Sequence, residues 1–384
     1  DQLKIVEGIT DAELSYIVEQ LDFDDKIDIL EELPANLVDM ILEKTPKDER
    51  RLINTFLNYP DTCAGSLMTP DYISLQKDMT VEEALAHIKE VGMDAETVYT
   101  CYVKDGGRKL AGIVSLSTLV ISDSQAKIND LMHTDYVWVN VYDDQEDVSE
   151  MFKKYGFIAM PVVDKEHRLV GIITVDDILD VIESETTEDI ELMAGILDFE
   201  QSDKEYLDKS VFQHVKARLP WLMILMVSLM ITGAIISYFE DMLSQVISLV
   251  AYMPLLMGTG GNTGTQASTL IVRGLALDEV DFDDALKVLW KELRISLCIG
   301  LILSVLNFTK IMLIDGEAWN IALTVCISMI LIVAFAKCLG GMVPMLAKKI
   351  GADPALMANP VISSLTDTVS VLIYFLMATL ILGL

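Results

Sequence analysis

The chain has 384 residues, of which 52% are hydrophobic, and its formal net charge is −31. Residues 1–209 carry 47 acidic and 18 basic side chains, whereas residues 210–384 carry 12 and 10, so a very acidic half is joined to a nearly neutral, apolar half. This charge argues against a nucleic-acid-binding protein, because such binding depends on Lys and Arg side chains that contact phosphates. The five cysteines form no CxxC pair that would indicate a zinc site.

Residues 1–62 are predicted to form a small acidic helical domain. Between Ile17 and Leu33, apolar residues recur every three or four positions among Asp and Glu residues, which is the spacing of one helix face. Pro34 and Pro46 stand where new helices would begin, because proline is tolerated in the first turn of a helix. We therefore expect several short helices here.

An internal repeat occupies residues 63–126 and 127–184. The stretch LMTPDYISLQKDMTVEEALAHI is similar to LMHTDYVWVNVYDDQEDVSEMF, and KLAGIVSLSTLV is similar to RLVGIITVDDIL. Runs of β-branched residues predict the order strand, helix, strand, strand, helix in each copy. The repeat resembles a tandem pair of CBS domains, a fold that commonly senses adenosine nucleotides or ions.

Residues 185–218 are predicted to form a connecting helix, and residues 219–384 a transmembrane domain. Five apolar runs are each long enough to cross a bilayer core, which requires roughly 20 apolar residues. These runs lie at about 219–239, 242–272, 289–314, 319–347 and 354–384.

The distribution of Lys and Arg indicates the orientation of these spans. With the acidic half in the cytosol, the basic residues flank the inner ends of the spans, and only Lys310 falls in an outer loop, in agreement with the positive-inside rule. We therefore expect a multi-pass protein of the plasma membrane, with its N-terminal and CBS domains in the cytosol and its C-terminus outside.

The second span is interrupted by glycines in PLLMGTGGNTGTQASTL, residues 254–270. Small residues such as Gly260 and Gly264 could serve only to bring helices close together. Alternatively, the many hydroxyl and amide oxygens here could line a water-filled pore, where polar groups are tolerated at membrane depth. We favour the pore, because the last span contains a second polar run.

That second run places a carboxylate inside an apolar span. Asn359, Ser363 and Asp367 are spaced four apart and therefore share one helix face. Pro360 would free the carbonyl four residues earlier as a further acceptor, and Asp367 would lie about 20 Å from the start of the span. An ionised group at this depth is costly and indicates a functional site.

The ligand of this face is predicted to be a hard cation, since the face offers oxygens without sulfur or imidazole. Magnesium keeps several of its waters, so a few carboxylate and carbonyl oxygens could hold the hydrated ion. In a symmetric dimer, the two Asp367 side chains would face each other across the axis. Lys337, midway along the fourth span, either extends to the membrane interface or pairs with Asp367.

The whole chain resembles the MgtE family of magnesium channels. The resemblance rests on the acidic helical domain, the tandem CBS pair, RLPWL at 218–222, GTGGNTGTQ at 258–266 and NPVISSLTD at 359–367. It implies a multi-domain membrane protein with an α-helical N-domain, an α+β CBS pair and an all-α transmembrane domain of five helices per chain. It also implies a homodimer whose pore closes when cytosolic Mg²⁺ is high.

The resemblance implies particular pore residues. The family's pore aspartate falls on Asp367 and its gating asparagine on Asn359. Ser363 takes a position that contributes a backbone carbonyl, and Asn262 and Gly258 match the adjoining motif of the second span.

The resemblance also implies regulatory Mg²⁺ sites among the soluble domains and the connector. The position before Phe157, often acidic in the family, is Gly156, so one implied site lacks this carboxylate. Solvated helix surface is the alternative for each carboxylate. The implied ligands are Asp177, Asp180, Glu185, Glu188, Asp189, Asp144 and Glu146.

Phe157, Thr174 and Asp177 occupy positions where CBS folds hold adenine and ribose, so ATP is a candidate ligand. The predicted function is a magnesium-selective channel controlled by cytosolic magnesium. The alternatives are a broader transporter that also admits Co²⁺ or Mn²⁺, and a nucleotide sensor that is merely anchored in the membrane. We expect no enzyme, because the four histidines are scattered and no nucleophile–base pair is evident.

Overall fold

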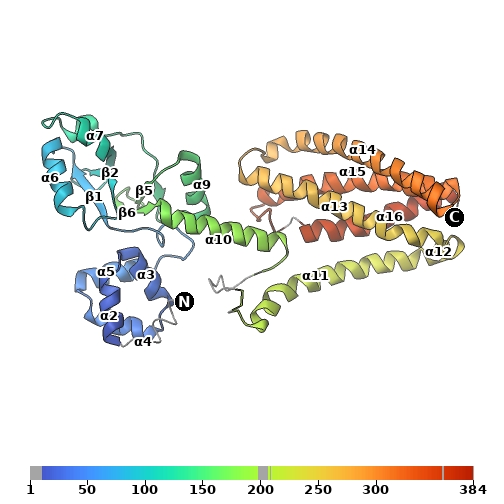
Figure 1. Ribbon diagram of the computed structural model, residues 1–384, viewed down its shortest axis with the longest axis horizontal. Helices are drawn as coiled ribbons and strands as arrows, with labels where there is room; N and C mark the ends of the chain where they lie inside the picture. Colours follow the sequence, from blue (N-terminus) through green and yellow to red (C-terminus); the bar gives the residue numbers. More distant parts are fainter. Residues whose placement is uncertain (1–10, 198–205, 208, 357–358, 384) are drawn as a thin grey trace. The chain divides into compact units, whose positions relative to one another are not determined.

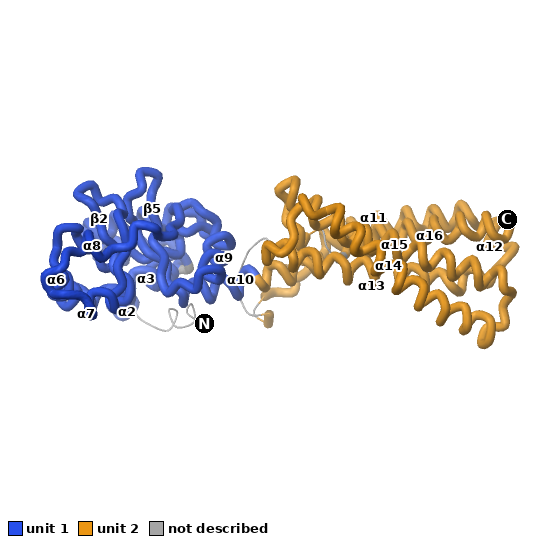
Figure 2. The backbone as a smooth tube through the Cα atoms, turned by 90° about the horizontal axis from the view of Figure 1, so that it is seen from above, with its two compact units in different colours: residues 1–185 blue, residues 186–384 orange. Residues whose placement is uncertain are grey.

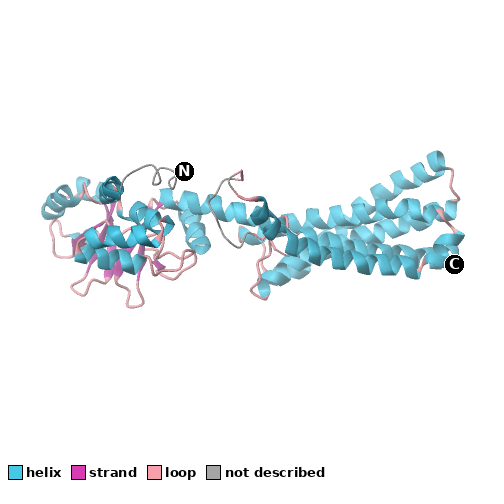
Figure 3. Ribbon diagram, turned by 90° about the horizontal axis from the view of Figure 1, so that it is seen from below, coloured by secondary structure: helices cyan, strands magenta, loops and turns pink. Residues whose placement is uncertain are grey.

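The computed structural model describes residues 11–197, 206–207, 209–356 and 359–383. The chain divides into two compact units, residues 1–185 and residues 186–384 (Figure 2). All the described strands belong to the first unit, and the second is helical (Figure 3). The boundary between the units precedes the change in charge and hydropathy, because the acidic residues 186–209 belong to the second unit.

Four short helices open the described part of the first unit, which starts at Asp11 (Figure 1). Pro34 and Pro46 immediately precede the third and fourth of them, which confirms the predicted helix starts. Ile27, Ile53 and Phe56 are almost fully buried in the core that these helices share with the second repeat. The helices are α2 (Asp11–Gln20), α3 (Phe23–Glu32), α4 (Ala35–Lys44) and α5 (Lys47–Phe56).

The two repeats have the same topology. In each copy the first two strands are parallel and the last two are antiparallel, giving the sheet orders β1-β2-β3 and β4-β5-β6. The order strand, helix, strand, strand, helix is therefore confirmed. The first copy contains β1 (Tyr72–Gln76), α6 (Val81–Val91), β2 (Thr97–Lys104), β3 (Leu110–Ser115) and α7 (Leu116–Ile121). After α8 (Ile128–Leu131), the second contains β4 (Val139–Asn140), α9 (Gln145–Tyr155), β5 (Ala159–Val163), β6 (Leu169–Thr174) and α10 (Val175–Met193).

The connector differs from the single helix that we expected over residues 185–218. Helix α10 ends at Met193, and the next helix among the described residues, α11, begins at Val211. Gly195 follows with a φ of +72°, a left-handed conformation that ends a helix and favours glycine. A Cβ atom at Gly195 would lie 2.1 Å from the Trp221 ring, so this residue must also be small.

Five long helices and several short segments form the second unit (Figure 1). Four of the long helices are apolar enough to cross a membrane, by length and composition: α11, α14, α15 and α16. The fifth, α13, falls outside that group because its middle is rich in glycine and polar residues. The bounds are α11 (Val211–Tyr238), α12 (Glu240–Gln245), α13 (Ser248–Ala276), η1 (Phe282–Asp284), α14 (Ala285–Lys310), η2 (Ile311–Asp315), α15 (Trp319–Lys349) and α16 (Asn359–Leu382).

The glycine-rich segment does not interrupt α13, contrary to our expectation. Helix α13 is continuous and packs against both α15 and α16. A Cβ atom at Gly340 of α15 would lie only 2.2 Å from the carbonyl oxygen of Gly264. Such close backbone contact requires glycine, and the packing offsets the low helix propensity of these residues.

Lys337 does not pair with Asp367, which corrects one of the two interpretations of this residue. Its Nζ atom lies 3.6 Å from Oε2 of Glu292 on α14. Both side chains are buried, with exposed fractions of 5% and 9%, so the alternative of extension to the interface is also wrong. Each charge therefore compensates the other inside the bundle, as buried ionised groups require.

We expect Lys337→Met to destabilise the membrane half by roughly 3–5 kcal/mol, because it leaves the Glu292 carboxylate buried without a counter-ion. The double variant with Glu292→Gln should recover most of this loss. Thermal unfolding of the purified chain in detergent measures both effects. Lys287→Met is the matched control, since Lys287 pairs with Asp284 on the surface and surface pairs contribute little. An unchanged midpoint in Lys337→Met would contradict this assignment.

Candidate functional site

Asp367 lies on α16, eight residues after the helix begins at Asn359. It is therefore about 12 Å from the start of the helix, nearer than the expected 20 Å. Pro360 falls in the first turn, where no carbonyl inside this helix lies four residues earlier, so the extra acceptor we expected is not created there. The side chain of Asn359 lies outside the described part of the structure.

Ser363 and Asp367 both face the glycine-rich segment of α13. A Cβ atom at Gly261 would lie 2.9 Å from Oγ of Ser363 and 3.7 Å from Oδ1 of Asp367. The absence of a side chain at Gly261 thus leaves room for these polar groups between the two helices. The structure brings together the two polar runs that the sequence separates by about a hundred positions.

The pore candidates on α13 lie on its exposed side in the single chain. Gly258 and Asn262 are both exposed, one helical turn apart, and nothing lies within 4 Å of a Cβ atom built at Gly258. Asp367 is half-buried and accepts no hydrogen bond from a residue that the structure describes. Asp367 thus offers an uncompensated carboxylate and Asn262 an accessible amide, and both are oxygen donors of the kind that suits a hydrated hard cation.

The predicted regulatory carboxylates occupy several positions in the structure. Asp144 accepts a hydrogen bond from the backbone N–H of Glu146 (2.9 Å) at the start of α9. Glu185 accepts one from Nε2 of Gln145 (2.6 Å). Within the described residues, no group of three or more His, Cys, Asp and Glu side chains is arranged to hold a metal ion. The remaining predicted ligands, Asp177, Asp180, Glu188 and Asp189, lie along α10.

The structure adds an acidic cluster that no sequence spacing would reveal. Burial, together with the carboxylates of Asp24, Asp22, Asp177 and Asp176, raises the pKa of Glu96 to about 7. The members of this acidic cluster come from three separate parts of the sequence: the helical domain and each of the two repeats. Mutual repulsion of this kind is relieved by a cation.

Asp177 and Asp71 lie in similar surroundings. Burial raises the pKa of Asp177 to about 6, with Asp24 and Asp176 adding to the effect while a hydrogen bond from Thr174 opposes it. Burial also raises the pKa of Asp71, again with a contribution from Asp24. The cluster therefore includes one predicted regulatory residue, Asp177.

The raised pKa of Glu96 predicts that stability depends on pH. Folding favours the protonated acid, so this stability is fully present below the unfolded pKa of about 4.5 and is lost as pH rises through about 7. Since Glu96 is partly exposed, we expect its ionisation to lower the free energy of unfolding by only about 1 kcal/mol. Without divalent cations, the thermal unfolding midpoint of the soluble half should decrease as the pH is raised from 5 to 8. Glu96→Gln should make this decrease smaller. Glu90→Gln, on the exposed surface of α6, should not.

The three residues expected at a nucleotide site are each held by a contact to a neighbouring side chain. Oγ1 of Thr174 donates a hydrogen bond to Oδ2 of Asp177 (2.8 Å), which fixes this carboxylate at the start of α10. Phe157 stacks against Tyr155, with ring centroids 5.3 Å apart. In the first repeat, the equivalent contact joins the hydroxyl oxygens of Ser115 and Thr118 (2.8 Å).

Comparison with known families accounts for most of the chain. The family of divalent cation transporters named MgtE matches residues 253–377, and the MgtE intracellular N domain matches residues 1–62. The CBS domain matches twice, at residues 64–122 and 128–184.

Individual relatives agree with these matches. The magnesium transporter MgtE of Thermus thermophilus is 40% identical over 333 residues, covering 87% of this chain and 73% of the relative. The magnesium transporter MgtE of Bacillus subtilis is 33% identical, covering 98% and 82%. Among solved structures, the cytosolic domain of the Mg²⁺ channel MgtE in complex with ATP is 36% identical, covering 47% of this chain and 74% of that one, with a TM-score of 0.45.

Proposed function

Since the chain belongs to the MgtE family of magnesium transporters, we propose that it is a magnesium-selective channel whose pore is lined by α13 and by the polar face of α16. The observation that carries this proposal is the Asp367 carboxylate, which lies within an apolar helix, opposite Gly261, without a cationic partner among the described residues. An anchor for a sensor would need no such group.

The pore residues have distinct roles in this proposal. Asp367 supplies the negative charge that attracts the dication. Asn262 and the backbone carbonyl of Ser363 accept hydrogen bonds from its water shell, while Gly258, with nothing within 4 Å of its Cβ position, leaves space for it. Holding the hydrated ion avoids the large cost of stripping its waters. Asn359, one turn before Ser363, is proposed to control passage at the end of the helix.

We propose that the functional unit is a homodimer. A single chain contributes one carboxylate, and Gly258 and Asn262 are exposed on its surface. A two-fold axis beside the face that carries these residues would enclose the ion between this face and the same face of a second chain. α13 is then a fifth span in addition to the four apolar ones, so the C-terminus lies outside the cell when the N-terminal domains are cytosolic.

The soluble carboxylates are proposed to sense magnesium. Asp144, Glu146, Asp177, Asp180 and Glu185 lie in a unit that already concentrates negative charge around Glu96. Carboxylates that share a bound dication repel each other less, so magnesium favours the state in which they are closest. We assign the same role to Glu188 and Asp189 on the connector.

A contact within the second unit links the connector to the pore. Leu192 and Met193, in the last turn of α10, pack against Val272 of α13 and against Ala355. The backbone N–H of Leu197 donates to the carbonyl oxygen of Ala217 on α11 (2.9 Å). Movement of the connector therefore reaches two of the long helices directly, which supports closure of the pore from the cytosolic side.

We also propose that the second repeat binds ATP, with Asp177 directed at the ribose hydroxyls and Phe157 beside the base. The hydrogen bond from Thr174 that orients Asp177 supports this assignment.

Flux measurements test the proposed function. The full chain in liposomes should admit Mg²⁺ into vesicles, whereas protein-free liposomes should not. Uptake of Co²⁺ or Mn²⁺ at a comparable rate would favour the broader divalent transporter. ATP binding without any cation flux would favour the anchored sensor. A monomer in mild detergent that still transports after reconstitution would contradict the dimer.

A further inference from the structure

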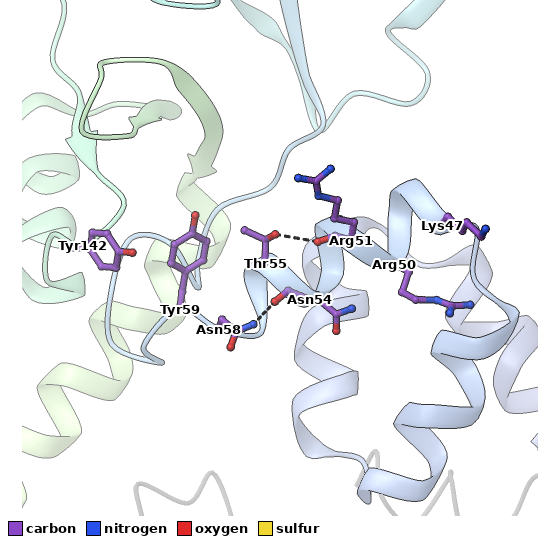
Figure 4. Close-up of a pocket in the computed structure, with 8 residues that line it drawn as sticks. All are labelled: Lys47, Arg50, Arg51, Asn54, Thr55, Asn58, Tyr59 and Tyr142. Atoms are coloured by element: carbon purple, nitrogen blue, oxygen red, sulfur yellow. Dashed lines mark hydrogen bonds between the residues drawn. The ribbon is translucent and has the colours of Figure 1, made fainter.

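A basic cavity lies on the helical domain, although residues 1–62 contain sixteen acidic and only six basic side chains. The cavity has a volume of about 590 Å³, and three of those six basic residues, Lys47, Arg50 and Arg51, line it. All three come from α5 (Figure 4). The other end of the cavity is formed by Tyr59 and Tyr142, the latter from the second repeat.

The arrangement follows from the amphipathic character of α5. Ile53 and Phe56 are buried in the core on one side. Lys47, Arg51 and Asn54 lie three or four positions apart, on one face, and line the cavity. A solvated helix surface would show the same spacing, and the contacts of these cations distinguish it from a binding site.

The cations of the cavity are not used to stabilise the fold through ion pairs. Lys26, elsewhere in this domain, pairs with Glu49 at 2.7 Å. Lys47 and Arg51, by contrast, form no ion pair with any residue that the structure describes, although acidic residues are abundant. Nη2 of Arg50 donates to the carbonyl oxygens of Glu43 and Thr45.

Arg50 retains a donor without a partner. Its Nε atom is buried and donates no hydrogen bond to any described residue. Because this atom is buried, the donors that a ligand in the cavity can reach are those of the exposed Lys47 and Arg51 side chains. The cavity wall thus combines two guanidinium groups, an ammonium group and the side-chain amides of Asn54 and Asn58.

These groups match phosphate oxygens. Guanidinium groups bind phosphate through paired hydrogen bonds, and lysine adds a point charge. The volume lies within the roughly 300–1,000 Å³ range of small-molecule sites. We propose that this cavity binds a small polyphosphate anion, a site that goes beyond the proposed channel function.

The tyrosine end distinguishes two sources of that polyphosphate. The rings of Tyr59 and Tyr142 meet edge-to-face with centroids 6.0 Å apart, and Nζ of Lys165 lies 5.6 Å from the centre of the Tyr142 ring. A nucleotide could place its base against these rings while its phosphates contact the cations. An inorganic polyphosphate would contact the basic end alone.

Calorimetric titration of the full chain in detergent with sodium tripolyphosphate, in magnesium-free buffer, tests the site. We expect one bound anion per chain and a loss of affinity of about tenfold or more in the variant Lys47→Gln/Arg51→Gln. Lys44→Gln/Lys89→Gln makes the same charge change at exposed positions outside the cavity and should leave the affinity unchanged. Absence of binding, equal losses in both variants, or tighter binding of hexaglutamate than of tripolyphosphate would overturn the proposal.

ATP provides the second arm, measured in the Asp177→Asn background so that a site in the second repeat does not contribute. A nucleotide is the source if ATP binds more tightly than tripolyphosphate and if Tyr142→Ala lowers the affinity for ATP only to that for tripolyphosphate. Equal affinities would identify an inorganic polyphosphate. Either result supports the site, provided that Lys47→Gln/Arg51→Gln weakens both ligands.

Discussion

Asp367→Asn should abolish most magnesium flux into liposomes, with a reduction of at least about tenfold. The substitution keeps the shape of the side chain but removes the charge that attracts a hydrated dication. Because Asp367 has no cationic partner among the described residues, its loss leaves no buried counter-charge and should not unfold the bundle. The expected effect is therefore on conduction, with an unfolding midpoint close to that of the wild type.

Two further variants limit the interpretation of this result. Asp241→Asn removes an exposed carboxylate from α12 in the same half of the chain and should conduct normally. Ser363→Ala should also conduct, since the proposal uses only the backbone carbonyl of this residue. If Asp367→Asn conducts like the wild type, the carboxylate is not part of the ion path.

Neutralising Asp177, Asp180, Glu188 and Asp189 together should produce a channel that stays open at high cytosolic magnesium. Converting a nearly open population into a nearly closed one requires roughly 5.5 kcal/mol, which several weak sites could supply jointly. Removing four of the ligands removes most of the differential affinity that drives closure. Flux from vesicles whose soluble domains face millimolar magnesium measures the effect.

The control for this variant is a second set of four neutralised carboxylates, Asp39, Glu43, Glu90 and Asp130, which are exposed elsewhere on the first unit. It makes the same change in net charge and should still close. Protease digestion offers an independent readout, because magnesium should protect the wild type and the control more than the variant. Equal protection of all three would mean that the α10 carboxylates are only a solvated surface.

Much of the fold could be predicted because local patterns and tertiary packing agree. In the repeats, β-branched runs such as AMPVVD became buried strands, and Pro34 and Pro46 marked helix starts. The connector could not be predicted, since apolar and acidic residues continue past Gly195 without a strong break. Only the contact with Trp221 and the positive φ show why the helix ends there.

The sequence alone identifies the candidate pore residues, which remain a prediction, but it gave the wrong backbone for α13. Asp367 is conspicuous in an apolar helix, so composition alone reveals it. The continuity of α13 depends on Gly264 meeting Gly340, a contact between distant positions that glycine counts do not disclose. Likewise, Lys337 could be matched with Glu292 only once α14 and α15 were packed together, because both lie far apart in sequence.

The two repeats share a backbone but not the polar contact at the start of their last helix. The first has two hydroxyl groups there, Ser115 and Thr118, whereas the second has Thr174 and the carboxylate of Asp177. A carboxylate, unlike a hydroxyl group, offers two negatively charged oxygens, each of which can accept a hydrogen bond from one hydroxyl of a ribose. Duplication of the domain therefore did not duplicate the proposed ATP site, and the CBS pair should bind one nucleotide per chain, two for a dimer, despite four CBS repeats.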